Sequence, residues 1–189
     1  MVPLVLSTVW ALLPSAQAAD NWNIDGANGV LHVRGALTES ACWLEMPSAW
    51  QDIWLGETGT AKLARFGDRG TPVAVQLHLR DCLRSPAKNR DLRSGNVLWS
   101  TAQPAVSVSF VAPADADNPQ LVKVRGASGV ALRLTDALGR DVRLGERGAP
   151  LLLTPGQSVL NYRVMPERTR APLQAGAYSA HVDFRLSYD

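Results

Sequence analysis

The chain has 189 residues, of which 46% are hydrophobic and 19% are charged, and its formal net charge is +2. This length allows one domain with a substantial core. The mild charge, with no basic stripe visible in the sequence, argues against a nucleic-acid partner.

The chain opens with an apolar segment that small residues follow. Residues 1–13 carry no charged side chain and are too short to span a bilayer as a helix. Residues 15–18 (Ser-Ala-Gln-Ala) match the small-x-small pattern that precedes a signal-peptidase cut. We therefore expect residues 1–18 to be a secretion signal; a buried N-terminal strand or helix is the alternative.

Two cysteines, Cys42 and Cys82, lie far apart in the sequence. In an exported chain such an even pair indicates one disulfide, and two free buried thiols are the alternative. In the chain-entropy model, closing a loop of this length stabilises the fold by about 4 kcal/mol.

Alternating apolar and polar side chains recur along the chain from residue 73 onward. They predict strands over residues 73–79, 106–110, 130–134, 142–144 and 160–164. Asp136-Ala-Leu-Gly139 predicts the turn of a hairpin. The charged residues 85–96 predict a solvated connection, and residues 166–172 predict a polar loop.

The last fourteen residues alternate almost without interruption and predict a half-buried strand over residues 176–189. One face carries the apolar side chains of Tyr178, Ala180, Val182, Phe184, Leu186 and Tyr188. A long apolar strand at this place is a candidate sheet edge, and an open edge pairs with other strands. With no segment of sustained helical period, the fold class predicted is an all-β, immunoglobulin-like sandwich.

Enzymatic signatures are missing from the sequence. His32, His78 and His181 each occupy the polar positions of an alternating segment, which predicts solvated faces; a shared metal site is the alternative. No nucleophile elbow, phosphate loop or dinucleotide-binding motif occurs. We expect no catalytic residue, no metal, no cofactor and no small-molecule substrate.

The tryptophans keep one binding hypothesis open. Trp43, Trp50, Trp54 and Trp99 would form an aromatic platform for a sugar if they were exposed together, as in an adhesin. Tryptophan in a small sandwich more often lies in the core or in an interface.

The order of several landmarks resembles the subunits of chaperone–usher fimbriae (pili). These landmarks are Gly29–Gly35, Ile53–Gly56, Leu77–Cys82, Gly129–Asp136 and Gly176-x-Tyr178, with Tyr188 next to last. Residues 41–58 resemble the terminator subunit of P pili more than the shaft subunit. The residues that carry this second resemblance are Met46, Trp50, Gln51, Gly56, Glu57 and Thr58.

The resemblance implies an incomplete immunoglobulin-like fold, a pilin domain over residues 35–189 that lacks its last strand. A neighbour's extension fills the gap by donor-strand complementation. Residues 19–34 would be this chain's own donor extension, with Leu31 and Val33 as inserted side chains. The candidate donor residues are Trp22, Ile24, Gly26, Leu31, Val33 and Gly35. Alternatively, residues 29–37 are the first strand of the sandwich and only residues 19–28 are free.

The same resemblance places the acceptor groove and chaperone-contacting edge on the terminal strand. Its residues are Tyr178, Val182, Phe184, Leu186, Tyr188 and Asp189, whose free carboxylate a chaperone would clamp. The implied partners are a periplasmic pilus chaperone, an outer-membrane usher and a neighbouring subunit. The implied route runs through the periplasm to a fimbria on the cell surface.

The function implied is that of a minor structural subunit, assembled by donor-strand exchange, that terminates and anchors the fibre base at the outer membrane. An adaptor or shaft pilin is the alternative within the family. From another class, a secreted carbohydrate-binding β-sandwich remains as the competing hypothesis.

Overall fold

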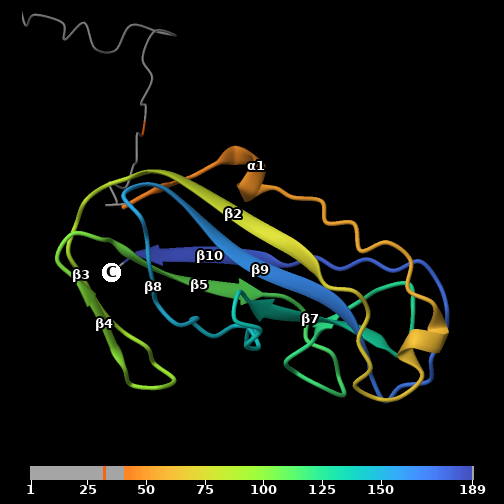
Figure 1. Ribbon diagram of the computed structural model, residues 1–189. Coiled ribbons are helices and arrows are strands. Elements are labelled where there is room, and N and C mark those ends of the chain that lie inside the picture. Colours follow the sequence, from red (N-terminus) through yellow and green to blue (C-terminus); the bar gives the residue numbers. More distant parts are fainter. Residues whose placement is uncertain (1–31, 33–40, 189) are drawn as a thin grey trace, which may run out of the picture. The chain divides into compact units, whose positions relative to one another are not determined.

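The computed structural model describes residue 32 and residues 41–188 (Figure 1). Strands dominate this part of the chain, which confirms the all-β prediction. The strands are β1 Trp43–Leu44, β2 Val73–Cys82, β3 Ala87–Arg90, β4 Val97–Ser100, β5 Ala105–Val111, β6 Val122–Lys123, β7 Val130–Asp136, β8 Leu151–Leu152, β9 Gly156–Arg168 and β10 Asp183–Tyr188. The helices are α1 Met46–Ala49 and the 3-10 turn η2 Thr60–Leu63.

The strands form two antiparallel sheets and a separate hairpin. The larger sheet has the order β1-β2-β9-β7-β6, and the smaller one has the order β10-β5-β8. The hairpin consists of β3 and β4, which pair with each other and with neither sheet (Figure 1). Among the described strands, β10 is therefore an edge strand of the smaller sheet.

The two sheets share one hydrophobic core. Leu77 of β2 and Leu160 of β9 face Val106 and Phe110 of β5 within a single cluster of buried side chains. The Phe110 ring meets that of Tyr162, on β9, edge-on at a centroid distance of 4.8 Å. Because apolar faces of both sheets bury each other, the architecture is a sandwich.

Strand β2 follows its predicted alternation. Leu77 and Leu79 are fully buried, whereas Gln76 on the opposite face is exposed. The strand pairs with β9 from Val73 opposite Val164 through Leu79 opposite Ser158. The period-2 pattern therefore identified both the strand and its inward face.

Strand β9 continues through Pro166, so the loop predicted to begin there is wrong. Pro166 lies opposite Leu132 of β7, and its carbonyl accepts a hydrogen bond from Gly70 N at 2.8 Å. The N and O of a strand residue point to the same side. The proline nitrogen therefore faces Gly70, which precedes β2, so the missing N–H lies outside the regular β2–β9 pairing that begins at Val164 opposite Val73.

Two other loop and strand boundaries also differ from expectation. Residues 85–96 were predicted to be a solvated connection, but β3 lies within them and the Asn89 side chain is buried. The hairpin turn after β7 forms, with Gly139 N donating to Asp136 O, yet residues 142–144 make no strand. Val142 keeps only a backbone bond to Leu134 O and is half-buried.

The disulfide between Cys42 and Cys82 is present, as predicted. It joins the residue before β1 to the end of β2, and both cysteines belong to the core. Within residue 32 and residues 41–188, no helix is long and apolar enough to cross a membrane.

The predicted N-terminal segments lie outside the described residues, apart from His32, which is exposed. This applies to the signal at 1–18, to the extension at 19–34 and to the candidate donor residues Trp22, Ile24, Gly26, Leu31, Val33 and Gly35. Asp189 is outside them as well.

Candidate functional site: the open edge at strand β10

Strand β10 has a neighbouring strand on one side only among the described elements. It pairs antiparallel with β5, from Asp183 opposite Val111 to Tyr188 opposite Val106. A strand alternately directs its backbone groups to its two sides, so the groups on the second side of β10 have no strand to bond. This edge is able to accept a further strand.

The inward face of β10 is only half covered. Phe184, Leu186 and Tyr188 pack against the core but stay partly exposed, whereas their partners Phe110, Val108 and Val106 on β5 are buried. The rings of Phe110 and Phe184 lie 6.3 Å apart, so the apolar core continues out to the edge. Apolar side chains left half in water favour a partner that covers them.

The strand begins later than the sequence predicted, at Asp183 rather than at residue 176. Residues 174–179 instead run antiparallel to residues 125–128, with bonds in both directions between Arg125 and Ser179 at 2.9 and 3.0 Å. Tyr178 therefore lies outside β10, although it and Val182 are still half-buried against the core. All five side chains predicted to line the groove are therefore half-buried, but only three of them lie on β10, and the other two precede it.

Close backbone contact explains why glycine occupies positions 126 and 129 in this lead-in. Both residues have positive φ, 100° and 75°. A Cβ on Gly126 would lie 2.3 Å from Ala177 O, and one on Gly129 would lie 2.7 Å from the Leu173 Cα. Any other residue would push the segment that leads into β10 away from its support.

The Tyr178 hydroxyl is buried and has no hydrogen-bond partner within the described part of the chain. Burial raises the pKa of this phenol above its ordinary value. An unmatched buried hydroxyl at the start of the groove is a place where an incoming backbone or side chain would gain a hydrogen bond.

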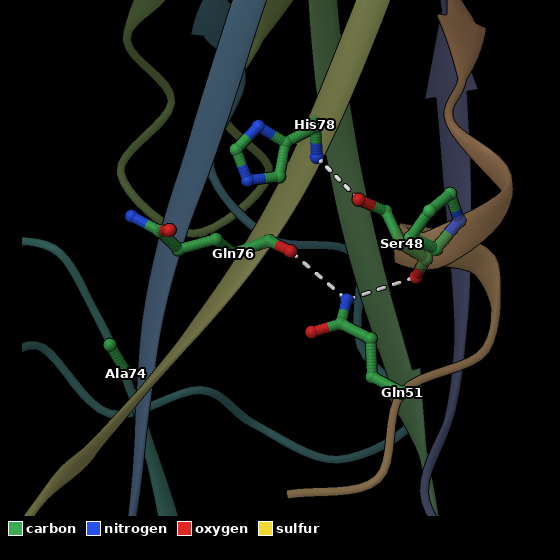
Figure 2. Close-up of a pocket in the computed structure, with 6 residues that line it drawn as sticks. Ser48, Gln51, Ala74, Gln76 and His78 are labelled. Carbon is green, nitrogen blue, oxygen red and sulfur yellow. Dashed lines mark hydrogen bonds between the residues drawn. The ribbon is translucent and has the colours of Figure 1, made fainter.

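Helix α1 and the residues after it belong to the terminator-like segment. Glu45 N donates to His78 O at 3.0 Å, and the Ser48 hydroxyl accepts a bond from His78 N at 2.8 Å. Figure 2 shows Gln51 between α1 and β2, where its amide nitrogen donates to Ser48 O and to Gln76 O, each at 3.0 Å. These bonds hold the one-turn helix along the edge of β2 that pairs with β1.

A shallow cavity of about 290 Å³ lies at this junction. Its lining consists of Pro47, Ser48, Gln51, Ala74, Gln76 and His78 (Figure 2). The Gln76 amide donates to Asn161 Oδ1 at 3.0 Å, so the amide donors of the lining are already used within the protein. The cavity is thus a seam between α1 and β2.

The other residues of the terminator-like pattern lie on the surface or in turns. Met46 and Trp50 are exposed, the latter by 80%. Gly56 has a φ of 68°, Glu57 is exposed and Thr58 is half-buried.

The tryptophans are not core residues. Trp43, Trp50, Trp54 and Trp99 are all largely exposed, with Trp54 at 83%. The first three belong to residues 43–54, whereas Trp99 lies on the β3–β4 hairpin. Trp99 therefore lies on a different element from the other three tryptophans of the sugar-platform hypothesis.

Sequence reasoning missed a buried ion network near the C-terminal end of β9. Glu167 is 2% exposed, and it accepts hydrogen bonds from Arg133 at both carboxylate oxygens and from Arg69 Nε at 2.9 Å. Arg133 also bonds Asp141. Hydrogen bonding to Glu167 raises the pKa of the Arg133 guanidinium above its ordinary value. The signal was a charged residue inside each of two apolar strands, but their pairing is not a local property.

No group of three or more potential metal-binding side chains comes together in residue 32 or residues 41–188. His78 lies beside α1, while His181 is exposed and pairs with Asp183 at 3.2 Å. His78 is thus partly covered on β2, and His181 lies in the exposed segment before β10.

Comparison with known proteins gives consistent matches. The family model described as "Fimbrial protein" matches residues 31–189. The PRS fimbrial minor pilin protein of Escherichia coli is 31% identical over 156 residues, which cover 82% of this chain and 74% of the relative. The probable major fimbrial subunit LpfA of Escherichia coli O157:H7 is 27% identical over 169 residues, 87% and 86% of the two chains.

Solved structures share the fold. The P pilus rod subunit PapA superposes with a TM-score of 0.64 at 24% identity, covering 79% of this chain and all of that one. A chain from a structure of a chaperone–usher pilus gives a TM-score of 0.63 at 21% identity, covering 88% and 98% of the two chains. The arrangement of the strands is therefore that of a pilus subunit.

Proposed function

The chain belongs to the fimbrial protein family, and on that premise we propose that it is a minor subunit of a chaperone–usher fibre, completed by a strand that another protein adds along β10. A periplasmic chaperone supplies this strand first, and assembly with neighbouring subunits follows at an outer-membrane usher. The role is structural, and the fibre is displayed on the cell surface.

The observation that carries the proposal is the half-covered edge at β10. Phe184, Leu186 and Tyr188 face the core without being buried, and the second side of their strand is open among the described elements. An added strand would bond this backbone and place alternate side chains over the exposed apolar surface. Residues 19–34 would serve the same purpose in the next subunit.

We further propose that the subunit terminates and anchors the base of the fibre. Residues 41–58 support this position through the resemblance to terminator subunits and through the exposed side chains of Met46, Trp50 and Trp54. Exposed apolar side chains gathered in one segment mark a contact with another protein. The relatives include both a major subunit and a minor pilin, so an adaptor or shaft position is the alternative.

The first experiment tests strand acceptance with two variants of β10. Leu186→Glu places a carboxylate on the inward face of the strand, while Arg185→Glu places a carboxylate on the exposed face and makes the larger change in net charge. We expect the first variant to lose co-purification with the periplasmic chaperone and the second to retain it. Equal co-purification of both variants would contradict the acceptor role of β10.

The second experiment tests the position in the fibre. The chaperone-bound subunit is mixed with N-terminal peptides of the neighbouring subunits, and chaperone release is followed over time. A terminator keeps its chaperone with every peptide, whereas release by one peptide identifies an adaptor or shaft subunit. A protein that is stable and monomeric without any chaperone would overturn the proposed function as a whole.

A further inference from the structure

The β3–β4 hairpin presents one face to solvent and one face to the protein. Lys88 pairs with Trp99 and Arg90 pairs with Val97, so these four side chains share a face, and all four are exposed. On the opposite face, Asn89 is only 4% exposed. The orientation of the hairpin is therefore defined, and its free face combines cations with an indole ring that is 67% exposed.

The turn of the hairpin binds its own acidic residue. Asp91 accepts hydrogen bonds from Arg93 N at 2.9 Å and from the Ser94 hydroxyl at 2.8 Å, and its backbone carbonyl accepts one from Gly95 N. The bond to Arg93 N, with that to Ser94, lowers the pKa of the Asp91 carboxyl. Asp91 thus organises the turn, where both of its carboxylate oxygens accept hydrogen bonds from within the turn.

The hairpin is more basic than the chain as a whole. Residues 83–100 contain four basic side chains and one acidic side chain, a net charge of +3, while the entire chain carries +2. The basic residues are Arg84, Lys88, Arg90 and Arg93. None of them forms a salt bridge with another described residue. These residues form a local basic group in a chain whose overall charge is mild.

The spacing of the cations along β3 suits an extended ligand. Lys88 and Arg90 are two residues apart on one strand, so their Cα atoms are separated by about 7 Å. Arg90 Nη1 donates to Gly95 O at 3.2 Å, which holds its guanidinium beside the turn with other N–H groups free. Trp99 lies across the ladder from Lys88 and offers a flat apolar face at the same level.

We propose that this hairpin face binds an acidic polysaccharide, with Trp99 stacking on a sugar ring and Lys88 and Arg90 bonding its carboxylates. Sugar rings present C–H faces to an aromatic ring, and guanidinium and ammonium groups form charge-assisted bonds with carboxylates. Complementary charge selects the acidic polymer over a neutral one.

A polysaccharide fits this surface better than a membrane does. The end of the hairpin, residues 91–96, is polar except for Leu92, so it offers little apolar surface to insert among acyl chains. Nucleic acid would be met by a cytoplasmic protein, whereas the sequence predicts export. The polymer is therefore taken to be extracellular.

The test uses the full chain, purified in whichever complex it forms, and immobilised polygalacturonate as the probe. Lys88→Glu with Arg90→Glu is compared with Lys62→Glu with Arg65→Glu, which makes the same charge change at exposed residues elsewhere. Trp99→Ala is compared with Phe66→Ala, which removes an exposed aromatic ring elsewhere. We expect the paired hairpin change to weaken binding about tenfold or more, and Trp99→Ala to weaken it several-fold.

Both control variants should bind within about twofold of the unchanged protein. Circular dichroism checks that the hairpin variants keep their fold, and Lys88→Gln with Arg90→Gln replaces the double charge reversal if they do not. Equal losses in the control variants, or no loss in the hairpin variants, would overturn the proposal. So would equal hairpin-dependent binding to anionic vesicles or to DNA. The readout needs no strand exchange, so it can fail or succeed independently of the proposed function.

Discussion

Glu167 illustrates how a single buried charge is stabilised in this sheet. Its carboxylate is bonded by Arg133 and Arg69, and Arg133 lies diagonally across the β7–β9 ladder, where its own neighbour is Met165. A buried ion pair contributes little net stability over an apolar replacement, but removing one partner leaves the other charge unmatched.

We therefore expect Glu167→Gln to lower the free energy of unfolding by about 3 kcal/mol. The matched control is Glu146→Gln, because Glu146 pairs with Arg143 at 3.4 Å on the surface. That change should cost less than about 1 kcal/mol. Denaturant titration measures both values, and similar costs for the two variants would show that Glu167 is not held as described.

Tyr162 makes stability depend on alkaline pH. Burial, together with the Asp136 carboxylate, raises the pKa of its phenol above the ordinary value of 10.0. The folded state therefore favours the neutral phenol, and this contribution is complete below the unfolded pKa and is lost as the pH rises towards the folded one.

Replacing Tyr162 by Phe removes this titration. We expect the denaturation midpoint of the unchanged protein to fall relative to that of Tyr162→Phe between about pH 9 and about pH 11. Midpoints measured across this range test the expectation. A difference that stays constant over the whole range would show that the phenol titrates alike in both states.

The element that supports β10 is the paired backbone of residues 125–129 and 173–179. Gly129 and Gly139 have nearly the same φ, 75° and 77°, but only Gly129 faces other backbone atoms within 4 Å. The two positions therefore separate the cost of a left-handed conformation from the cost of close approach.

We expect Gly139→Ala to cost about 1 kcal/mol of unfolding free energy and Gly129→Ala about 3 kcal/mol. Thermal denaturation measures both. Gly129→Ala should also weaken chaperone binding, because the lead-in to β10 must move. Equal costs at the two positions would mean that residues 173–179 move aside for the added methyl group at little cost in free energy.

At the scale of the whole molecule, the sandwich is expected to gain its last strand from outside. Phe184 is half-buried in the subunit alone and would be buried in the completed sandwich. Truncating a buried phenylalanine costs about 3–5 kcal/mol, and truncating a half-exposed one costs less.

Phe184→Ala should therefore destabilise the chaperone complex more than the free subunit, by a margin of about 1–2 kcal/mol. Melting curves of both forms measure the margin, with Arg185→Ala on the exposed face as the control. An identical cost in the two forms would argue that no added strand covers Phe184.

Features that depend on residues close together in the chain could be predicted from the sequence. Alternation along β2 and β5 identified the strands and their inward faces, the cysteine pair indicated the disulfide, and the landmark residues identified the family, which the family model confirms. Each of these signals is a spacing along the chain, and side-chain direction in a strand follows directly from such spacing.

Burial and strand pairing that depend on segments far apart in the sequence were decided by the tertiary structure alone. Asn89 is buried because the hairpin packs one face against the protein, and Glu167 is buried beside an arginine of another strand. Pro166 is accepted in β9 because it lies beyond Val164, where the regular pairing with β2 begins. Tyr178 likewise lies outside the strand that the alternation predicted, because its neighbour Ser179 pairs with Arg125 instead. Local periodicity sets which way a side chain points, whereas burial and pairing depend on the path of the whole chain.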